Sequence, residues 1–419
     1  MKSYDLVTIG GGPAGMAAAL AAYKNNIKKV LIIERNLELG GILNQCIHNG
    51  FGLHHFKQEL TGPEYSHRVI QEILNTNIEC LTNTTVLKIA PDRAIHAINK
   101  DHGYIKIGTK TVVLAMGCWE RTRGAIRIHG SRPSGIFTAG TAQRLVNIDG
   151  LLPGKKIVIL GSGDIGLIMA RRMTLEGAKV ETVFEIMPHS NGLTSNIAQC
   201  LNDFDIPLLL QTTITKIHGK DRVTGVTISK VDDSLTPIAS TERFISCDTV
   251  LLSVGLIPEN EISRAAGIEL DRKTNGPIIG ELRQTSKNGI FACGNVLQVH
   301  DLVDFVSEEG TLAGFGAAQY IKNQLEPNFS HITFADNGIS YIVPQKINIK
   351  NIDDKVRLFI RVKNTFANSV INAYLGDKII ASKKENKFLP AEIVNIELKK
   401  SDLMNWHEKE IKIKVEAQI

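Results

Sequence analysis

Six small residues near the N-terminus have the types and the spacing of a phosphate-binding turn. In order they are Gly10, Gly11, Gly12, Pro13, Ala14 and Gly15. Gly10 permits a tight turn, Gly12 lets a pyrophosphate approach the backbone, and Gly15 lets a following helix pack closely on the preceding strand. The N–H groups and the partial positive charge of that helix end would then face the phosphates. The chemistry that this turn predicts is the binding of a dinucleotide.

The segments on either side of the turn are those that a βαβ unit needs. Apolar residues at 5–9 predict a strand, the small residues at 16–23 predict a helix, and residues 29–33 predict a second strand. The second strand ends at Glu34, which lies 24 positions after Gly10 and can accept a hydrogen bond from a ribose hydroxyl. Because strand, helix and carboxylate are all in place, we favour this interpretation over an ordinary glycine-rich turn.

The same arrangement occurs a second time, about 150 residues later. Its turn consists of Gly161, Ser162, Gly163, Asp164, Ile165 and Gly166. An apolar strand at 156–160 precedes this turn, and a helix through residue 175 follows it. The next strand, at 179–184, ends at Glu185, again 24 positions after the first glycine of the turn. Two complete fingerprints predict two nucleotides bound to one chain.

The surroundings of the first unit favour FAD as its ligand. After Glu34 come Arg35 and a short segment that ends in Gly40 and Gly41, and paired glycines allow a long ligand to approach the backbone closely. A later apolar strand at 111–114 fits a return to the same sheet. It leads into a turn of small residues, Ala115, Met116 and Gly117. We expect these residues to contribute to an FAD site.

The second unit is predicted to bind NAD(H). No arginine follows Glu185 closely, so no cation is near in the sequence to bind the 2′-phosphate of NADP(H). A carboxylate also repels a phosphate, and we therefore expect NADH to be preferred over NADPH. The alternative is that His189, Arg171 or Arg172 reaches a 2′-phosphate from elsewhere in the fold.

The order of these segments predicts an α/β protein in which one Rossmann-like domain interrupts another. The FAD-binding domain would comprise residues 1–120 and 246–325, and the inserted NAD(H)-binding domain would comprise residues 121–245. From residue 326 apolar and charged residues alternate, which predicts a small, β-rich and sandwich-like domain over 326–419. Nothing in this domain resembles catalytic machinery. It could bind a partner subunit, or it could be only a lid or an oligomer contact.

The composition is that of a globular protein with two or three domains. Of the 419 residues, 43% are hydrophobic and 22% are charged, and no apolar run reaches the roughly 18 residues needed to span a membrane. The six cysteines are scattered without a CxxC pair and no signal sequence precedes Tyr4, so a reduced, cytoplasmic protein is expected. Residues 343–419 carry 15 basic and 10 acidic side chains, which accounts for the net charge of +5. Because these charges alternate with apolar residues, we expect exposed strand faces rather than nucleic-acid binding.

From Tyr4 to about Tyr320 the chain resembles the two-dinucleotide flavoprotein disulfide reductase superfamily. The resemblance is carried by the two glycine turns, the turn at 115–117 and the segment GIFACGN at 289–295. It implies a flavoprotein that uses FAD and a nicotinamide dinucleotide.

The resemblance also implies where the flavin lies. It places Gly294 and Asn295 beside the flavin, at a position where relatives usually carry Gly-Asp. The amide of Asn295 can still form a hydrogen bond there but brings no charge. A helix over 301–319 is expected to direct its N-terminus at the flavin ring, where its partial positive charge would stabilise the reduced form. Asp301 or Asp304 could be no more than an N-cap of this helix.

Three segments, at 40–52, 132–143 and 294–301, resemble a narrower group. Its members are flavoprotein subunits of hydrogen cyanide synthase and of opine and proline oxidases, and oxidoreductases associated with glycerol-3-phosphate dehydrogenase. This resemblance implies dehydrogenase and iron–sulfur protein subunits as partners. Since the chain has no clustered cysteines, any iron–sulfur cluster would be held by another chain.

The chain departs from the superfamily in the segment after the paired glycines. Disulfide reductases carry a CxxxxC pair there, whereas this chain has only Cys46. A dithiol relay needs a resolving thiol, so among the catalytic candidates Cys46 and His48 we favour pocket residues over a redox thiol. His48, His54 and His55 have no metal-ligand spacing with Cys46, and no metal site is predicted.

Three functions are compatible with these features. The favoured one is an FAD-dependent oxidoreductase that exchanges hydride with NAD(H) and passes electrons to or from an acceptor or partner subunit. The second is a flavoprotein electron-transfer subunit of a dehydrogenase for an amino acid, an opine or glycerol 3-phosphate. The third is an NADH peroxidase in which Cys46 cycles through a sulfenic acid. A homo-oligomer is compatible with all three.

Overall fold

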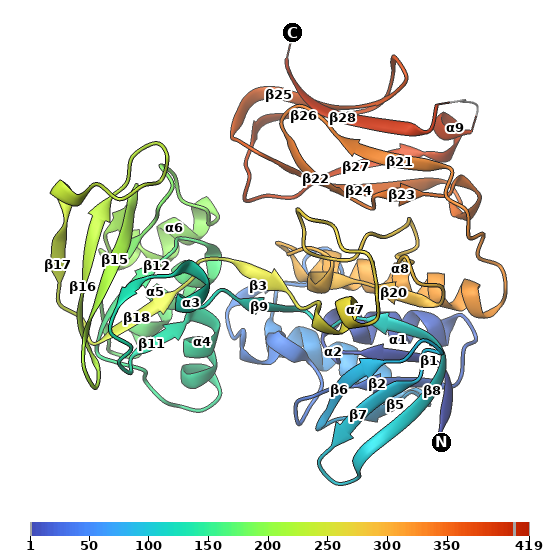
Figure 1. Cartoon of the computed structure of the whole chain (residues 1–419), viewed down its shortest axis with the longest axis horizontal. Helices are drawn as coiled ribbons and strands as arrows, with labels where there is room; N and C mark the ends of the chain where they lie inside the picture. Colours follow the sequence, from blue (N-terminus) through green and yellow to red (C-terminus); the bar gives the residue numbers. More distant parts are fainter. Residues whose placement is uncertain (1, 405–407, 419) are drawn as a thin grey trace. The chain divides into compact units, whose positions relative to one another are not determined.

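The computed structural model describes residues 2–404 and 408–418, which form two compact units (Figure 1). The described residues of the first unit lie within 2–44, 49–118 and 258–418. The second unit consists of Gln45–His48 and Trp119–Ile257. The chain passes between the units through the short strands β9 (Cys118–Glu120) and β19 (Leu256–Pro258). The second unit is therefore an insertion into the first.

The first unit is built on a seven-stranded sheet in the order β5-β2-β1-β8-β7-β6, with β20 also paired to β8. Its strands are β1 (Ser3–Ile9), β2 (Val30–Ile33), β5 (Glu79–Leu81), β6 (Thr84–Ile89), β7 (Ile95–Asn99), β8 (Gly103–Leu114) and β20 (Ile290–Ala292). The start of β8 pairs antiparallel with β7, whereas its end pairs parallel with β1 and β20. One long strand thus joins the antiparallel meander β6-β7-β8 to the parallel layer.

Three helices cover one face of this sheet. They are α1 (Pro13–Lys24), α2 (Gly62–Leu74) and α8 (Val303–Ile321), the last being the helix predicted at 301–319. Helices α1 and α8 touch through small residues, because a Cβ atom added at Gly310 would lie 2.3 Å from the carbonyl oxygen of Ala14. A Cβ atom at Gly314 would lie 2.1 Å from that of Ala18. Any larger side chain would push the two helices apart. Three further short elements of this unit are β3 (Asn49–Phe51), β4 (Leu60–Thr61) and α7 (Glu261–Ala265).

The second unit contains a parallel five-stranded sheet and a mixed four-stranded sheet, in the orders β11-β18-β12-β13-β14 and β10-β15-β16-β17. The parallel strands are β11 (Ile136–Thr138), β12 (Lys156–Leu160), β13 (Lys179–Phe184), β14 (Leu208–Leu209) and β18 (Thr249–Leu252). The others are β10 (His129–Gly130), β15 (Thr212–Gly219), β16 (Val223–Lys230) and β17 (Arg243–Ile245). The helices are α3 (Arg123–Ile126), α4 (Ala139–Asn147), α5 (Asp164–Leu175) and α6 (Thr194–Cys200). Because β18 pairs with β12, residues 246–257 belong to this unit and not to the FAD-binding segment in which the sequence analysis placed them.

The C-terminal segment forms the predicted sandwich of two β-sheets around a shared apolar core (Figure 1). One sheet has the order β23-β21-β28-β25-β26 and the other β22-β24-β27. The strands are β21 (His331–Ala335), β22 (Ile339–Val343), β23 (Lys346–Ile347), β24 (Lys355–Val362), β25 (Phe366–Leu375), β26 (Lys378–Phe388), β27 (Val394–Lys399) and β28 (Glu410–Ala417), with helix α9 (Lys400–Leu403). We expected a separate domain at 326–419, but this sandwich groups with the first unit. Its Val343 and Phe359 belong to the same buried apolar cluster as side chains of the seven-stranded sheet.

Candidate functional site

The first glycine turn has a shape that only glycine permits at two of its positions. Gly10 has φ +107°, and a Cβ atom there would lie 2.3 Å from the carbonyl oxygen of Ala115. A Cβ atom at Gly15 would lie 1.9 Å from the carbonyl oxygen of Gly10. Gly12 differs, because the nearest atom to a Cβ there is the Cα of Gly41, at 4.0 Å. The turn is therefore tightly packed at its ends and open at its middle glycine, where a phosphate would need room.

The second glycine turn repeats this geometry. Gly161 has φ +100°, and a Cβ atom there would lie 2.0 Å from the carbonyl oxygen of Ser253. A Cβ atom at Gly166 would lie 2.5 Å from the carbonyl oxygen of Gly161, whereas one at Gly163 would meet only Ser253 Oγ, at 3.8 Å. Gly12 and Gly163 are the N-cap residues of α1 and α5, and neither helix has a side-chain cap. Backbone N–H groups at both helix ends are thus available to an anion.

The two predicted carboxylates hold their turns in the same way. Glu34 is 5% exposed, and its carboxylate accepts hydrogen bonds from the N–H groups of Gly11 (2.7 Å) and Asn36 (2.8 Å). Glu185 is 3% exposed and accepts hydrogen bonds from the N–H group (3.0 Å) and hydroxyl (2.7 Å) of Ser162. Each carboxylate is fixed at the end of its second strand beside a glycine turn. This donor and acceptor set fits a dinucleotide at each turn.

The other residues predicted for the first site lie around the same turn. Ala115 donates a hydrogen bond from its N–H group to the carbonyl oxygen of Ile9 (2.9 Å), and Gly117 has φ +78°. Arg35 forms an ion pair with Glu259 at 3.2 Å, which leaves the guanidinium only partly available to a phosphate. Pro13 begins α1, where its missing N–H group costs no hydrogen bond.

The remaining residues of the second site hold its loop. Asp164 accepts hydrogen bonds from the N–H group of Leu193 (2.8 Å) and from the amide of Asn196 (2.7 Å), and Ile165 packs against the core of this unit. Arg172, one of the three alternative partners for a 2′-phosphate, bonds to Glu176 (2.7 Å) and to Asn147.

Gly294 and Asn295 begin a 3-10 turn at Gly294–Val296 whose first residue packs on α1. A Cβ atom at Gly294, which has φ +76°, would lie 2.7 Å from the Cβ of Ala14. The side-chain oxygen of Asn295 accepts a hydrogen bond from the N–H group of His300 (3.0 Å), and its amide points at the sulfur of Cys118 (3.6 Å). The turn is thus held against the helix that starts at the first glycine turn.

A buried cluster of ionisable side chains supports this turn, and the sequence analysis did not identify it. Glu309 of α8 is fully buried and accepts hydrogen bonds from the Gly294 N–H group (2.7 Å), His300 Nε2 (2.9 Å) and Arg283 Nε (3.1 Å). Burial alone would raise the pKa of the Glu309 carboxyl, but His300, Arg283 and these hydrogen bonds lower it overall. One sequence signal pointed to the cluster, because Glu309 shares a helical face with Val306, Gly310 and Ala313, and a carboxylate on such a face needs a partner.

Asp301 and Asp304 are not N-caps of α8. The N-cap residue is Leu302, without a side-chain hydrogen bond. Asp304 accepts a hydrogen bond from the His55 N–H group (3.0 Å), and Asp301 forms an ion pair with Arg361 (2.6 Å). Both carboxylates therefore tie other segments to the start of the helix.

Cys46 and His48 belong to the second unit, whereas Gly40 and Gly41, which precede them in the sequence, belong to the first. The Cys46 thiol points at the side-chain oxygen of Gln143 (3.7 Å), and Gln45 bonds to the same oxygen (3.0 Å). Burial raises the pKa of the Cys46 thiol to about 12, although its bond to Gln143 opposes this effect. Burial also lowers the pKa of His48, against the effect of the Asp164 carboxylate. A thiol with such a pKa carries little thiolate at neutral pH.

Among the described residues, no group of three or more His, Cys, Asp or Glu side chains is arranged to hold a metal ion. No helix within 2–404 or 408–418 is both long and apolar enough to cross a membrane.

Comparison with protein families and curated proteins gives the chain's relatives. The family model described as "Pyridine nucleotide-disulphide oxidoreductase" matches residues 4–319. One subunit of the opine oxidase of Agrobacterium tumefaciens is 24% identical over 70% of this chain, and the match spans 61% of that relative's length. Thioredoxin reductase of Mycolicibacterium smegmatis is 26% identical over 76% of this chain and 94% of its own length. The predicted superfamily is confirmed, and opine oxidase belongs to the narrower group named above.

Solved structures share the fold at low sequence identity. The thioredoxin reductase of T. acidophilum covers 77% of this chain with a TM-score of 0.62 and 22% identity. A NAD-dependent persulfide reductase from A. fulgidus covers 88% of the chain with a TM-score of 0.59 and 18% identity. These structures confirm the predicted α/β class with two Rossmann-like parallel sheets.

Proposed function

The chain belongs to the pyridine nucleotide-disulphide oxidoreductase family, and on this premise we propose that it is an FAD-dependent oxidoreductase that exchanges hydride with NAD(H). The observation that carries the proposal is the duplicated site, in which an open glycine at a helix N-terminus lies beside a buried carboxylate. We assign FAD to the turn at Gly12 and Glu34, and NAD(H) to the turn at Gly163 and Glu185. When bound, FAD supplies the two-electron chemistry, and an acceptor or partner subunit takes or provides the electrons.

The chain's own residues bind and orient the two nucleotides. The N–H groups at the start of α1 and of α5 would face the pyrophosphates, and Glu34 and Glu185 would each accept a hydrogen bond from a ribose hydroxyl. Gly41 has φ +59°, and a Cβ atom there would lie 3.0 Å from the Cα of Gly12, so the absence of a side chain lets this segment approach the first turn closely.

We propose NADH as the preferred nicotinamide dinucleotide. The carboxylate of Glu185 is negatively charged and engaged by Ser162, so a 2′-phosphate at that place would meet repulsion instead of a cation. Arg172 is held by Glu176, which supports the same preference.

A second candidate function is an electron-transfer subunit of a larger dehydrogenase. The observation that favours it is the absence of a second cysteine near Cys46 in the sequence, because the chain then has no dithiol through which to reduce an acceptor. The relative from opine oxidase is itself one subunit of an enzyme, and the chain spans 61% of its length. The raised pKa of Cys46 counts against the NADH peroxidase alternative.

Rapid mixing of the flavin-loaded protein with NADH or NADPH tests the leading proposal. We expect NADH to bleach the flavin absorbance and NADPH to bleach it with a lower second-order rate constant. If neither nucleotide bleaches the flavin, the proposal fails. Purification of the native protein under mild conditions tests the second candidate, which requires a dehydrogenase or iron–sulfur protein to accompany the chain.

A further inference from the structure

The C-terminal sandwich touches the loop before α8 through two side chains of β24. Phe359 is 1% exposed and packs edge-on against the ring of His300, with the ring centroids 5.4 Å apart. The ring of Phe305, in the first turn of α8, lies 6.0 Å from Phe359, and the Arg283 guanidinium lies 5.8 Å from its centroid. Phe359 thus contacts two of the three members of the buried cluster of ionisable side chains.

Arg361 binds the same loop with its polar atoms. One terminal nitrogen donates hydrogen bonds to the Val299 carbonyl oxygen (3.0 Å) and to Asp301 Oδ1 (2.6 Å). Its Nε donates to the hydroxyl of Tyr341 (2.9 Å), and its other terminal nitrogen donates to the carbonyl oxygen of Pro390 (3.0 Å). This planar, multiply bonded guanidinium joins the sandwich to residues 299–301.

The loop held by Arg361 leads directly to the turn assigned to the flavin. His300 lies inside this loop, donates its N–H group to Asn295 and binds Glu309 with its ring. Glu309 in turn accepts the N–H group of Gly294. The contacts therefore run without a gap from β24 through His300 and Glu309 to Gly294 and Asn295. Arg283 Nη1 also donates to the carbonyl oxygen of Glu281 (3.1 Å), whereas the buried Nη2 of Arg283 and Nδ1 of His300 have no hydrogen-bond partner in the described part of the chain.

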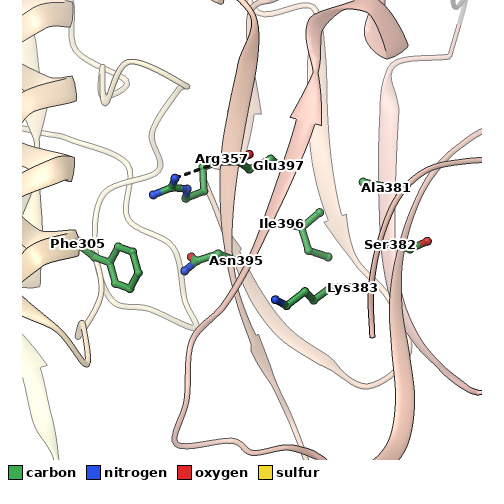
Figure 2. A pocket seen from close by; sticks show the side chains of 8 residues that line it. All are labelled: Phe305, Arg357, Ala381, Ser382, Lys383, Asn395, Ile396 and Glu397. Atoms are coloured by element: carbon green, nitrogen blue, oxygen red, sulfur yellow. Dashed lines mark hydrogen bonds and ion pairs between the residues drawn. The ribbon is translucent and has the colours of Figure 1, made fainter. Parts of the chain in front are cut away.

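A second contact joins the sandwich to α8 itself. Arg357 of β24 bonds to Glu308 at 2.5 Å and to Glu397 of β27 at 3.0 Å. Figure 2 shows Arg357 and Asn395 on strands of the sandwich that face Phe305 of α8. These residues line a cavity of about 400 Å³, but its cations are already paired with carboxylates, so the cavity makes no anion site.

We propose that strand β24 of the C-terminal sandwich is a structural part of the flavin site. Phe359 and Arg361 of β24, acting with Glu309 of α8, are positioning residues for Gly294 and Asn295. The proposal rests on the assignment of FAD to the first unit. It gives the sandwich a role that differs from both a partner-binding module and a lid.

The test compares two full-length variants with a matched control on the same strand. Arg361→Ala removes all four hydrogen bonds of the guanidinium. Arg361→Lys keeps the positive charge but lacks the planar group that can bond to several partners at once. Lys355→Ala is the control, because Lys355 is an exposed cation of β24 that pairs with Glu397 within the sandwich. The dissociation constant of FAD is measured by titrating the apoprotein, and the visible flavin spectrum and the midpoint potential are recorded for each holoprotein.

We expect Arg361→Ala to weaken FAD binding about tenfold or more and to shift the flavin spectrum and potential, since hydrogen bonds to a charged group are lost. Arg361→Lys should fall between Arg361→Ala and the wild type, and Lys355→Ala should match the wild type. If Arg361→Ala does not fold, Asp301→Asn weakens the same contact from the other side and should give the same shifts.

If Arg361→Ala has the same dissociation constant for FAD and the same flavin spectrum as the wild type, this inference is overturned while the proposed function stays intact. Equal effects of Lys355→Ala and Arg361→Ala would also overturn it, because they would indicate general destabilisation. A wild-type protein that binds no FAD would overturn both the inference and the proposed function.

Discussion

Alanine at the two open glycines, Gly12 and Gly163, should separate nucleotide binding from folding. Gly12 has φ −77° and ψ −175°, and Gly163 has φ −66° and ψ 161°, which are ordinary values for any residue. The nearest atoms to the added methyl groups lie 4.0 and 3.8 Å away, so neither substitution produces a clash. Alanine is a poorer N-cap than glycine, which destabilises the variant, but it also restricts the unfolded chain, which stabilises it. We therefore expect the free energy of unfolding of each variant to change by less than about 1 kcal/mol.

The effect on binding should be much larger, because each methyl group lies where a phosphate would approach the N–H groups of the helix. A hydrogen bond to a charged group contributes about 1.5 to 3 kcal/mol, so losing one weakens binding about tenfold to hundredfold. Gly12→Ala should bind FAD about tenfold to hundredfold more weakly but retain its fold. Gly163→Ala should retain FAD but show a raised dissociation constant for NADH.

The assay is a titration of apoprotein with FAD and of holoprotein with NADH, together with thermal unfolding of each apoprotein. Gly15→Ala serves as a positive control for misfolding, since its Cβ would lie 1.9 Å from the carbonyl oxygen of Gly10. If Gly12→Ala binds FAD as the wild type does, the first turn is not the pyrophosphate site. If Gly163→Ala loses FAD and Gly12→Ala loses NADH, the two assignments are reversed.

Three further outcomes follow from the geometry. Gly310→Ala should lower stability by about 1 to 3 kcal/mol, seen as a lower melting temperature, because its Cβ would lie 2.3 Å from the backbone of Ala14; an unchanged melting temperature would contradict the tight α1–α8 contact. Hydrogen bonds from Tyr374 and neighbouring side chains lower the pKa of the Glu416 carboxyl to about 2, so the stabilisation by Glu416 is complete above its unfolded pKa of about 4.3 and is lost as pH falls towards 2. In Glu416→Gln the melting temperature should therefore change less between pH 5 and 2 than in the wild type. An equally steep fall of the melting temperature in the variant would argue against this contribution. The pKa of about 12 predicts that alkylation of Cys46, followed by mass spectrometry, still accelerates from pH 8 to 10, whereas a plateau below pH 8 would indicate a reactive thiolate.

Local patterns predicted most of what positions the nucleotides. The two turns, their strands and helices, and the positions of Glu34 and Glu185 follow from steric rules that act within about 30 residues. The helix at Val303–Ile321 and the C-terminal strands were also visible as periodic patterns. These features need no knowledge of distant contacts.

The parts that sequence reasoning missed depend on contacts between distant segments. Gln45 bonds to the carbonyl oxygen of Gly140 (2.9 Å), which draws Cys46 and His48 into the second unit although Gly41 lies in the first. Arg283, His300 and Glu309 meet only after β20 and α8 have packed on the sheet. A pattern of apolar residues along each segment contains no information on which buried cation will meet which buried carboxylate.

The insertion of the second unit also has a consequence for the order in which a growing chain can acquire structure. Strands β1, β2 and β8 leave the ribosome early, but β20 and α8, which complete their sheet and cover it, follow only after the whole of 119–257 has been made. At usual rates of synthesis this delay is on the order of ten seconds. Apart from residues 45–48, the second unit is a continuous stretch and can fold during that time. Until then, the N-terminal strands and the alanine-rich α1 lack the strand and the helix that complete and cover their sheet, so the first unit can close only after the second has been made.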